Sequence, residues 1–470
     1  MNGKNNKVLK AGIAYTISNF LVKGMSFLTM PIFTRIMSSE DIGQFSNVST
    51  WFGILAILTT FELFSSINIA RFDFKEDLDS YISSILILGT VITAIFYIII
   101  LCNHIFFERL FSMDFFTINV LFIYLLFYPA IQTFQIRCRI DYDYKGVMIV
   151  SLISSLLSCL ASLVCVLVMK DKLCGRILGN YIPLIIIAIV IYFSFFKRNT
   201  RISIKFWRYS LVVSIPLVWH LLAGNLLISS DQVMITRFLG NKANGYYSVA
   251  YTCAMVVSLL WTSLNSAWSP WAYEMMDGKK YNELYKKSKP YLLFFLILVI
   301  LFMLFAPEIL LIIGGDSYLE AVYVIPPVMV GYVFQFIYSF YINIEYYHKK
   351  QKFMAIGTTI AALINIGLNF WLIPHFGYYA AAYTTLIGYI VLFLIHFFIV
   401  RKMGYAYWYD TRFFIAALIM MCIFMLGCNV LYNNLMLRIM VIVVLVLLFI
   451  ITVAKNKKKV ENAIKKIVKT

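Results

Sequence analysis

Residues 34–46, TRIMSSEDIGQFS, decide how this chain is organised, because the same framework returns at residues 236–248 as TRFLGNKANGYYS. The threonine–arginine pair, the glycine and the final serine recur at a constant offset of 202 positions, without a gap. Each copy joins two apolar runs, and an even number of such runs separates the copies. The two halves should therefore share one orientation in a membrane, as in proteins built from parallel repeats. A weaker echo relates residues 144–179 to residues 352–385.

The composition of the 470-residue chain excludes a water-soluble fold, since 62% of its residues are hydrophobic and only 13% are charged. A soluble domain averages roughly 25% charged residues. Hydrocarbon offers no hydrogen-bond partners, so a spanning backbone must form helices or a closed barrel, and the long apolar runs predict helices. The eight cysteines form no CxxC pair and mostly lie in apolar runs, where a thiol behaves as a small hydrophobe. We therefore expect an all-α polytopic membrane protein without a metal or other cofactor.

Windows of about 20 apolar residues predict about fourteen membrane-spanning helices. They lie near residues 11–33, 43–66, 80–102, 115–136, 147–169, 177–196, 209–230, 245–267, 290–313, 321–343, 354–373, 379–400, 413–431 and 435–454. The repeat divides them into an N-terminal six-helix bundle (residues 1–200), a C-terminal six-helix bundle (201–402) and a final segment (403–470) with two helices and a basic tail.

Basic residues predict the orientation, because lysine and arginine resist translocation. About 31 of the 40 basic residues lie at the termini and in the even-numbered connections, which places both termini in the cytoplasm. The N-terminus lacks a small-x-small cleavage site, so the first span should remain attached. The net charge of +18 is spread in short clusters between apolar runs, so the expected partner is anionic membrane lipid and not nucleic acid.

Three stretches carry a resemblance to a known family. They are residues 34–46, residues 305–328 (FAPEILLIIGGDSYLEAVYVIPPV) and residues 363–385 (LINIGLNFWLIPHFGYYAAAYTT). With the layout of six, six and two spans, they resemble the Wzx-type polysaccharide flippases of the multidrug/oligosaccharidyl-lipid/polysaccharide exporter superfamily. The resemblance implies two bundles around a central cavity that opens alternately to each side of the membrane.

The resemblance also implies a function, which is transport and not catalysis. The implied substrate is an undecaprenyl-diphosphate-linked oligosaccharide, flipped to the outer leaflet of a bacterial inner membrane. It would serve O-antigen (lipopolysaccharide), capsule or exopolysaccharide assembly, with a polysaccharide polymerase and chain-length machinery as partners. Some relatives couple transport to ion gradients.

A polar face in the first predicted span is the first candidate site. Thr16, Asn19, Lys23 and Ser26 recur at helical spacing. A lysine near mid-membrane costs about 2.5–3.5 kcal/mol on insertion scales, so Lys23 is a functional candidate that we expect to attract the diphosphate. The alternative is an ion pair between Lys23 and Glu62 of the second span that ties the bundle together.

The seventh predicted span offers different groups. The offset of 202 pairs Lys23 with Asn225, which is neutral, so the cationic feature is confined to the N-terminal half. His220 and Asp231 fall on one face of the seventh span, where they could bind or relay a coupling proton, because imidazole titrates near neutrality. A packed histidine and an interfacial aspartate are the alternative.

Three arginines lie at the ends of spans. Arg35 and Arg237 occupy matched positions at the outer mouth, where they hold a gate, anchor headgroups or serve a shared turn geometry. Arg71, at the cytoplasmic end of the second span, either meets the incoming diphosphate or is ordinary positive-inside charge.

Polar residues of the tenth and eleventh spans are further candidates. Glu345 ends the tenth span as a coupling or ion-pair group, and Asn365 and Asn369 lie one turn apart in the eleventh. Amides and aromatic rings contact sugars, but asparagine also joins membrane helices to each other.

Two other functions compete with the flippase. A cation-coupled multidrug or toxin exporter of the same superfamily would need a carboxylate in a largely apolar cavity. A membrane polymerase or ligase for the same lipid-linked glycans would carry a long outer loop, and this sequence predicts none. A nucleotide-powered pump is disfavoured, because the chain has no GxxxxGK[ST] motif.

Overall fold

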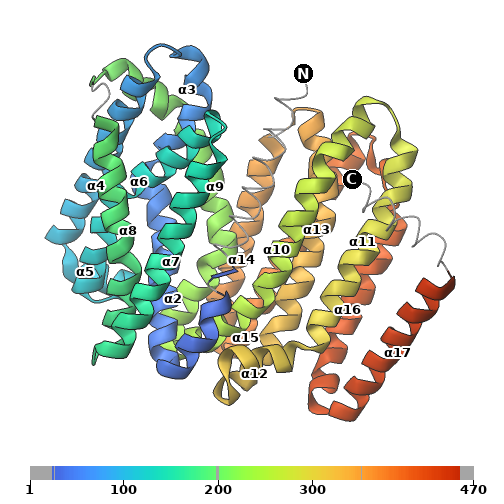
Figure 1. Cartoon of the computed structure of the whole chain (residues 1–470). Coiled ribbons are helices and arrows are strands. Elements are labelled where there is room, and N and C mark those ends of the chain that lie inside the picture. Colours follow the sequence, from blue (N-terminus) through green and yellow to red (C-terminus); the bar gives the residue numbers. More distant parts are fainter. Residues whose placement is uncertain (1–23, 26, 197–200, 351, 456–470) are drawn as a thin grey trace.

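The computed structural model describes residues 24–25, 27–196, 201–350 and 352–455, and every regular element in that part of the chain is a helix (Figure 1). The N-terminal half contains a first helix (Phe27–Ile36), α2 (Ser39–Thr60), η1 (Leu63–Ser66), α3 (Ile67–Asp73), α4 (Leu78–Cys102), α5 (His104–Phe111), α6 (Phe115–Ile140), α7 (Tyr144–Val168) and α8 (Lys172–Phe196). The C-terminal half contains α9 (Ile204–Leu239), α10 (Asn241–Asp277), α11 (Tyr281–Leu304), α12 (Ala306–Gly314), η2 (Asp316–Val324), α13 (Ile325–Tyr347), α14 (Lys352–Phe376), α15 (Tyr378–Lys402), η3 (Ala406–Trp408), α16 (Thr411–Asn433) and α17 (Leu435–Lys455).

The predicted all-helical, multi-span fold is confirmed. Among the described residues, 11 helices are long and apolar enough to cross a membrane. A further span is broken, because α2 and the segment Leu63–Asp73 meet at a bend of 59°. Two shorter apolar helices, Phe27–Ile36 and Leu435–Leu445, fall where the first and last spans are predicted.

Two hydrophobic cores give the molecule two bundles. One core is built mainly by α2 to α6 and α8 with Phe206 from the first turn of α9, and the other mainly by α9 to α16 with Phe33 from the first helix and single residues of α2 and α7. The long helix α9 joins both, since Trp207 Nε1 donates to the Ser84 carbonyl (2.9 Å) while Leu227 lies in the second core. Figure 1 shows the bundles converging at the end of the molecule that holds α12 and the start of α2.

Helix α13 lies at the centre of the second bundle. In the span Asp316–Tyr347, 83% of its apolar 18-residue stretch is buried inside the protein, the highest share among the described spans. Polar residues near its C-terminal end, including Glu345, therefore contact neighbouring helices and not lipid. At the edge of the same bundle, α17 is tied to α12 by an ion pair between Arg438 and Glu308.

Candidate functional site

The two copies of the repeat touch each other at the starts of α2 and α10. A Cβ atom on Gly43 would lie 1.8 Å from the Asn241 carbonyl oxygen, and one on Gly245 would lie 1.9 Å from the Ser39 carbonyl oxygen. Ser39 and Asn241 are themselves 202 positions apart, so the two approaches are equivalent under the repeat. We call this pair of approaches the repeat contact. It joins the bundles on the side that the distribution of basic residues predicts to face outward.

Hydrogen bonds between the bundles hold the repeat contact closed. Asn244 Nδ2 donates to the Gly43 carbonyl (2.8 Å), and Asn241 Nδ2 donates to Gln44 Oε1 (3.2 Å). Nearby, the side-chain oxygen of Gln232 in α9 accepts two hydroxyl hydrogen bonds from α2. Side-chain amides thus satisfy backbone and side-chain groups that two glycines bring close together.

Arg35 and Arg237 fasten the same region in a reciprocal way. Arg35 Nη2 donates to the Ile312 carbonyl in the last turn of α12 (3.0 Å), and Arg237 Nη1 donates to the Arg109 carbonyl in the last turn of α5 (2.8 Å). Each arginine therefore reaches from its own half to a helix C-terminus of the other half, where the helix dipole favours a cation. Among the described residues, neither arginine forms an ion pair.

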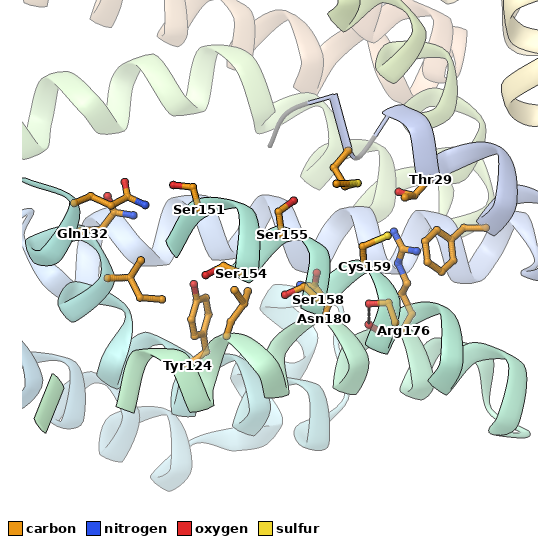
Figure 2. Close-up of a pocket in the computed structure, with 16 residues that line it drawn as sticks. Thr29, Tyr124, Gln132, Ser151, Ser154, Ser155, Ser158, Cys159, Arg176 and Asn180 are labelled. Atoms are coloured by element: carbon orange, nitrogen blue, oxygen red, sulfur yellow. Dashed lines mark hydrogen bonds between the residues drawn. The ribbon is translucent and has the colours of Figure 1, made fainter. Parts of the chain in front are cut away.

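A polar cavity of about 380 Å³ lies between the first helix and helices α6, α7 and α8, and we call it the N-terminal cavity (Figure 2). Five serines form what we call the serine face of α7: Ser151, Ser154, Ser155, Ser158 and Ser162. Their spacing places them on one side of the helix. Gln132 and Gln135 of α6 and Asn180 of α8 add amide groups to the wall. Arg176 is the one charged residue among the described residues that line it.

Arg176 lies at one end of the N-terminal cavity. Figure 2 shows its guanidinium beyond Ser158, with the serine face leading away toward Ser151 and Gln132. The guanidinium carbon lies 3.1 Å from the centre of the Phe33 ring. Because α8 begins on the side predicted to face outward, Arg176 occupies the outer end of the cavity, four residues from the start of that helix.

A second polar centre is buried in the C-terminal bundle around Asp231, which has no exposed surface. Its carboxylate accepts hydrogen bonds from the Tyr247 hydroxyl (2.6 Å), from Asn369 Nδ2 (2.7 Å) and from the Thr385 hydroxyl. Asn365 extends the network by accepting from Asn369 (3.2 Å). These groups come from α9, α10, α14 and α15. Carboxylate, amide and hydroxyl oxygens are the ligand atoms that a hard cation prefers, and a carboxylate can also bind a proton.

The other candidates of α9 lie away from this network. His220 precedes Asp231 by eleven residues, which corresponds to about 16 Å along a helix. The buried His220 Nδ1 has no hydrogen-bond partner. Asn225 faces α2, where its amide nitrogen lies 3.1 Å from the position of a Cβ on Gly53. The structure therefore brings together Asp231 and the asparagines of α14, and it leaves His220 apart from them.

The candidates of the second span lie on either side of its bend. Glu62 sits at the bend with a φ of 51°, a left-handed conformation uncommon outside glycine, and its carboxylate accepts from Ser65 (3.3 Å). The Arg71 guanidinium lies 4.5 Å from the centre of the Phe72 ring. The polar face predicted for the first span lies outside the described residues; it consists of Thr16, Asn19, Lys23 and Ser26. The diphosphate site and the Lys23–Glu62 pair therefore stay predictions.

Glu345 makes a buried contact with His396 inside the C-terminal bundle. Its Oε1 lies 2.7 Å from His396 Nδ1, and neither side chain has exposed surface. The Tyr338 ring packs against the imidazole, with 4.9 Å between the ring centres. Glu345 Oε2 and His396 Nε2 have no partner. The pair joins α13 to α15, away from the N-terminal cavity.

The N-terminal cavity is not among the sites that the sequence predicts. Arg176 is one of the few basic residues in the connections predicted to face outward, although the structure places it inside the apolar helix α8. The serines of α7 are also absent from the predicted sites, although their recurrence every one to four residues over three turns is a detectable signal of a polar helix face. The sequence does not reveal which helices face these serines; in the structure they are α6, α8 and the first helix.

Solved structures show the fold of this chain. The lipid II flippase MurJ, in an inward closed conformation, superposes with a TM-score of 0.70 at 17% identity, over 95% of this chain and 100% of that one. A multidrug resistance MATE family transporter of the MOP superfamily, in an inward-facing conformation, superposes with a TM-score of 0.66 at 14% identity, over 84% and 98% of the two chains. The chain therefore has the helical fold that these two membrane proteins share.

The family follows from the sequence match. Residues 8–276, more than half of the chain, match the family described as Polysaccharide biosynthesis protein, and the chain belongs to it. It is 23% identical over 430 residues to an uncharacterized membrane protein of Methanocaldococcus jannaschii, covering 84% of each. It is 21% identical over 378 residues to Lsg locus protein 1 of Haemophilus influenzae, covering 77% of this chain and 90% of that protein. The predicted relation to polysaccharide biosynthesis is thus confirmed at the level of the family.

Proposed function

We propose that this protein flips an undecaprenyl-diphosphate-linked oligosaccharide repeat unit from the inner to the outer leaflet of the plasma membrane by alternating access. The observation that carries the proposal is the N-terminal cavity, whose wall combines hydroxyl and amide groups with one guanidinium and no carboxylate among its described residues. Such a wall fits a polar, anionic headgroup that hydrocarbon would exclude. The prenyl chain would stay in lipid while the headgroup crosses inside the protein.

The closed repeat contact supports an inward-facing starting state. The bundles are held together on the side predicted to be outer by two glycine approaches and by the reciprocal bonds of Arg35 and Arg237. Opening this end while the opposite end closes would release the headgroup outward. Both termini would then lie in the cytoplasm, as the distribution of basic residues predicts.

Asp231 is the coupling group in this proposal. A proton or a hard cation bound there would change the charge of a fully buried carboxylate, and such a change alters which hydrogen bonds the site favours. The Tyr247 hydroxyl donates to Asp231, and Tyr247 lies two residues after Gly245 of the repeat contact. Ion binding at Asp231 is thereby linked through one turn of α10 to the contact that must open.

The second candidate function is a cation-coupled multidrug exporter, because the MATE structures share this fold. Asp231 favours it too, since such an exporter needs a carboxylate to bind the coupling cation. The two functions differ in what the cavity must hold. An exporter of apolar cations needs an apolar, negatively charged cavity, whereas the N-terminal cavity is polar and carries a cation. A polymerase or ligase receives no support from the fold.

A deletion strain tests the proposal. Loss of the gene should leave lipid-linked repeat units in the cytoplasmic leaflet and remove surface polysaccharide, which an impermeant lectin or oxidant applied to intact cells would detect. Normal surface polysaccharide in that strain, with no redundant flippase, would contradict the proposal. Increased drug sensitivity with normal polysaccharide would favour the exporter. Adjacent genes for glycosyltransferases, a polymerase and chain-length machinery would identify the expected partners.

A further inference from the structure

Arg176 lies where two cavities meet. It lines the N-terminal cavity, and it also lines a second cavity of about 320 Å³ between the two bundles, next to the repeat contact. Phe33 is common to both cavities, so the guanidinium and this ring form part of the wall between them. A charged side chain in this position faces protein cavities on both sides.

This partly buried cation has no carboxylate partner among the described residues. The Arg176 Nη1 is buried without a hydrogen-bond partner. The rings of Phe33 and Phe45 lie 3.1 Å and 4.6 Å from the guanidinium carbon. Such cation–π contacts replace only part of the hydration that a buried charge loses. Unpaired charges that face an interior cavity in a membrane protein mark the path of a substrate.

The wall beside Arg176 is suited to hydroxyl groups. The Oγ atoms of Ser154 and Ser158 are buried without a hydrogen-bond partner, and Asn180 of α8 lines the same space. Each serine hydroxyl can donate and accept, and an amide does both at once, so this wall can satisfy sugar hydroxyls in either direction. The wall therefore fits a ligand that is anionic at one end and polyhydroxylated beside it.

We infer that Arg176 binds a phosphate of the lipid-linked substrate at the outer end of the N-terminal cavity, and that the serine face of α7 holds the adjoining sugar. This inference rests on the proposed function and names the group that anchors its substrate. A guanidinium suits the role because its planar fork makes two parallel hydrogen bonds to phosphate oxygens. The five serines extend over about three turns, enough to follow more than one sugar unit.

Phosphate binding at Arg176 also acts on the outer end of the protein. A phosphate competes with the Phe33 and Phe45 rings for the guanidinium, because an anion is the stronger partner. Phe33 directly precedes Thr34 and Arg35, which both donate to backbone carbonyls of α12 in the other bundle. Substrate in the cavity thereby weakens the packing that supports the closed repeat contact.

The test measures binding to the full-length protein in lipid nanodiscs. Geranylgeranyl diphosphate is the probe, geranylgeraniol is its uncharged counterpart, and affinity is determined by isothermal titration calorimetry. Arg176→Gln should weaken binding of the diphosphate at least about tenfold and leave geranylgeraniol unaffected. The diphosphate affinity of Arg176→Lys should fall between those of the parent protein and Arg176→Gln, since lysine keeps the charge but lacks the planar fork of the guanidinium. Lys170→Gln is the matched control, because it removes an exposed charge near the same end of α8.

Each outcome decides the inference. Equal affinity of Arg176→Gln and the parent protein would overturn it, and so would a parent protein that does not bind the diphosphate at all. If Arg176→Gln fails to fold, judged by its melting curve, then Ser158→Ala supplies the test with a geranylgeranyl diphosphate that carries one hexose. The Ser158 hydroxyl has no hydrogen-bond partner in the structure, so Ser158→Ala should fold but bind the sugar-bearing probe several-fold more weakly. Unchanged affinity would overturn the inference.

The binding result is separable from the proposed function. Diphosphate binding that depends on Arg176 together with normal surface polysaccharide in the deletion strain would retain the binding site and reject the flippase. Loss of surface polysaccharide in that strain, with binding independent of Arg176, would retain the flippase and reject this site.

Discussion

Replacing Gly43 by alanine should open the repeat contact. The added Cβ would lie 1.8 Å from the Asn241 carbonyl oxygen. Both sides of this approach are helix backbone, so neither can rotate away as a flexible side chain would. Contacts below 3.0 Å are essentially never seen for a real Cβ, so the starts of α2 and α10 must separate by at least about 1.2 Å.

That separation breaks two hydrogen bonds between the bundles. The bond from Asn244 to the Gly43 carbonyl would lengthen from 2.8 Å, and the one from Asn241 to Gln44 from 3.2 Å, beyond hydrogen-bonding distance. At about 1 kcal/mol for each bond, the closed state loses about 2 kcal/mol relative to the open one. This corresponds to a shift of about 30-fold in the ratio of closed to open protein.

The assay reads access to the cavity next to the repeat contact. Thr252 of α10 lines that cavity, so Thr252→Cys is introduced after the native cysteines have been replaced. Intact cells are treated with a membrane-impermeant maleimide. Labelling should rise strongly with Gly43→Ala, and likewise with Gly245→Ala, which meets the same obstacle from the other half. Gly367→Ala is the matched control, because its added Cβ would have nothing within 4 Å.

Unchanged labelling in Gly43→Ala would refute the reasoning, provided that denatured protein labels equally in all variants. So would an equal rise in Gly367→Ala, because the effect would then come from adding a methyl group and not from the repeat contact.

Three further predictions follow from other contacts. Asp231→Asn should abolish any rise in melting temperature when sodium chloride replaces choline chloride, and should reduce transport at least tenfold; an unchanged salt response would remove Asp231 from coupling. Replacing either Glu345 or His396 alone by leucine should destabilise the protein by about 3–5 kcal/mol, because one member of a buried pair stays unpartnered, and the double variant should lose less than the sum; additive losses in denaturant unfolding would contradict this. The Lys289 ammonium, 2.6 Å away, lowers the pKa of Asp410 to about 2. The ionised Asp410 therefore stabilises the protein fully above about pH 4, and this stabilisation is lost toward pH 2. Asp410→Asn should lower the melting temperature above pH 4 but not near pH 2, and a difference that is constant with pH would refute the pair.

Amino-acid patterns predicted the all-helical, multi-span fold of this protein. Hydrocarbon forces each span to satisfy its own backbone, so the spans are local features that apolar runs reveal. The offset of 202 between two stretches likewise needs no coordinates. The same offset could not tell that the two copies touch, because a repeat describes similarity and not proximity.

The polar sites divide along the same line. Asp231, Asn365 and Asn369 stand out as polar residues within apolar runs, but their shared hydrogen bonds require α9 and α14 to lie side by side. Arg176 was readable only as a basic residue near a helix end, because its significance depends on cavities on both sides. His220 shares a predicted face with Asp231, yet their separation along the helix keeps them out of contact.

The amino-acid pattern predicts a chain that crosses a membrane many times, carries a repeat at an offset of 202 residues, and resembles polysaccharide flippases. These properties depend on hydrophobicity, charge and repetition, which are written residue by residue. Helix packing alone brings Gly43 and Gly245 together at one end of the molecule and leaves Arg176 without a carboxylate partner among the described residues. Such properties depend on contacts between helices far apart in the chain, and a contact exists only once the helices have packed.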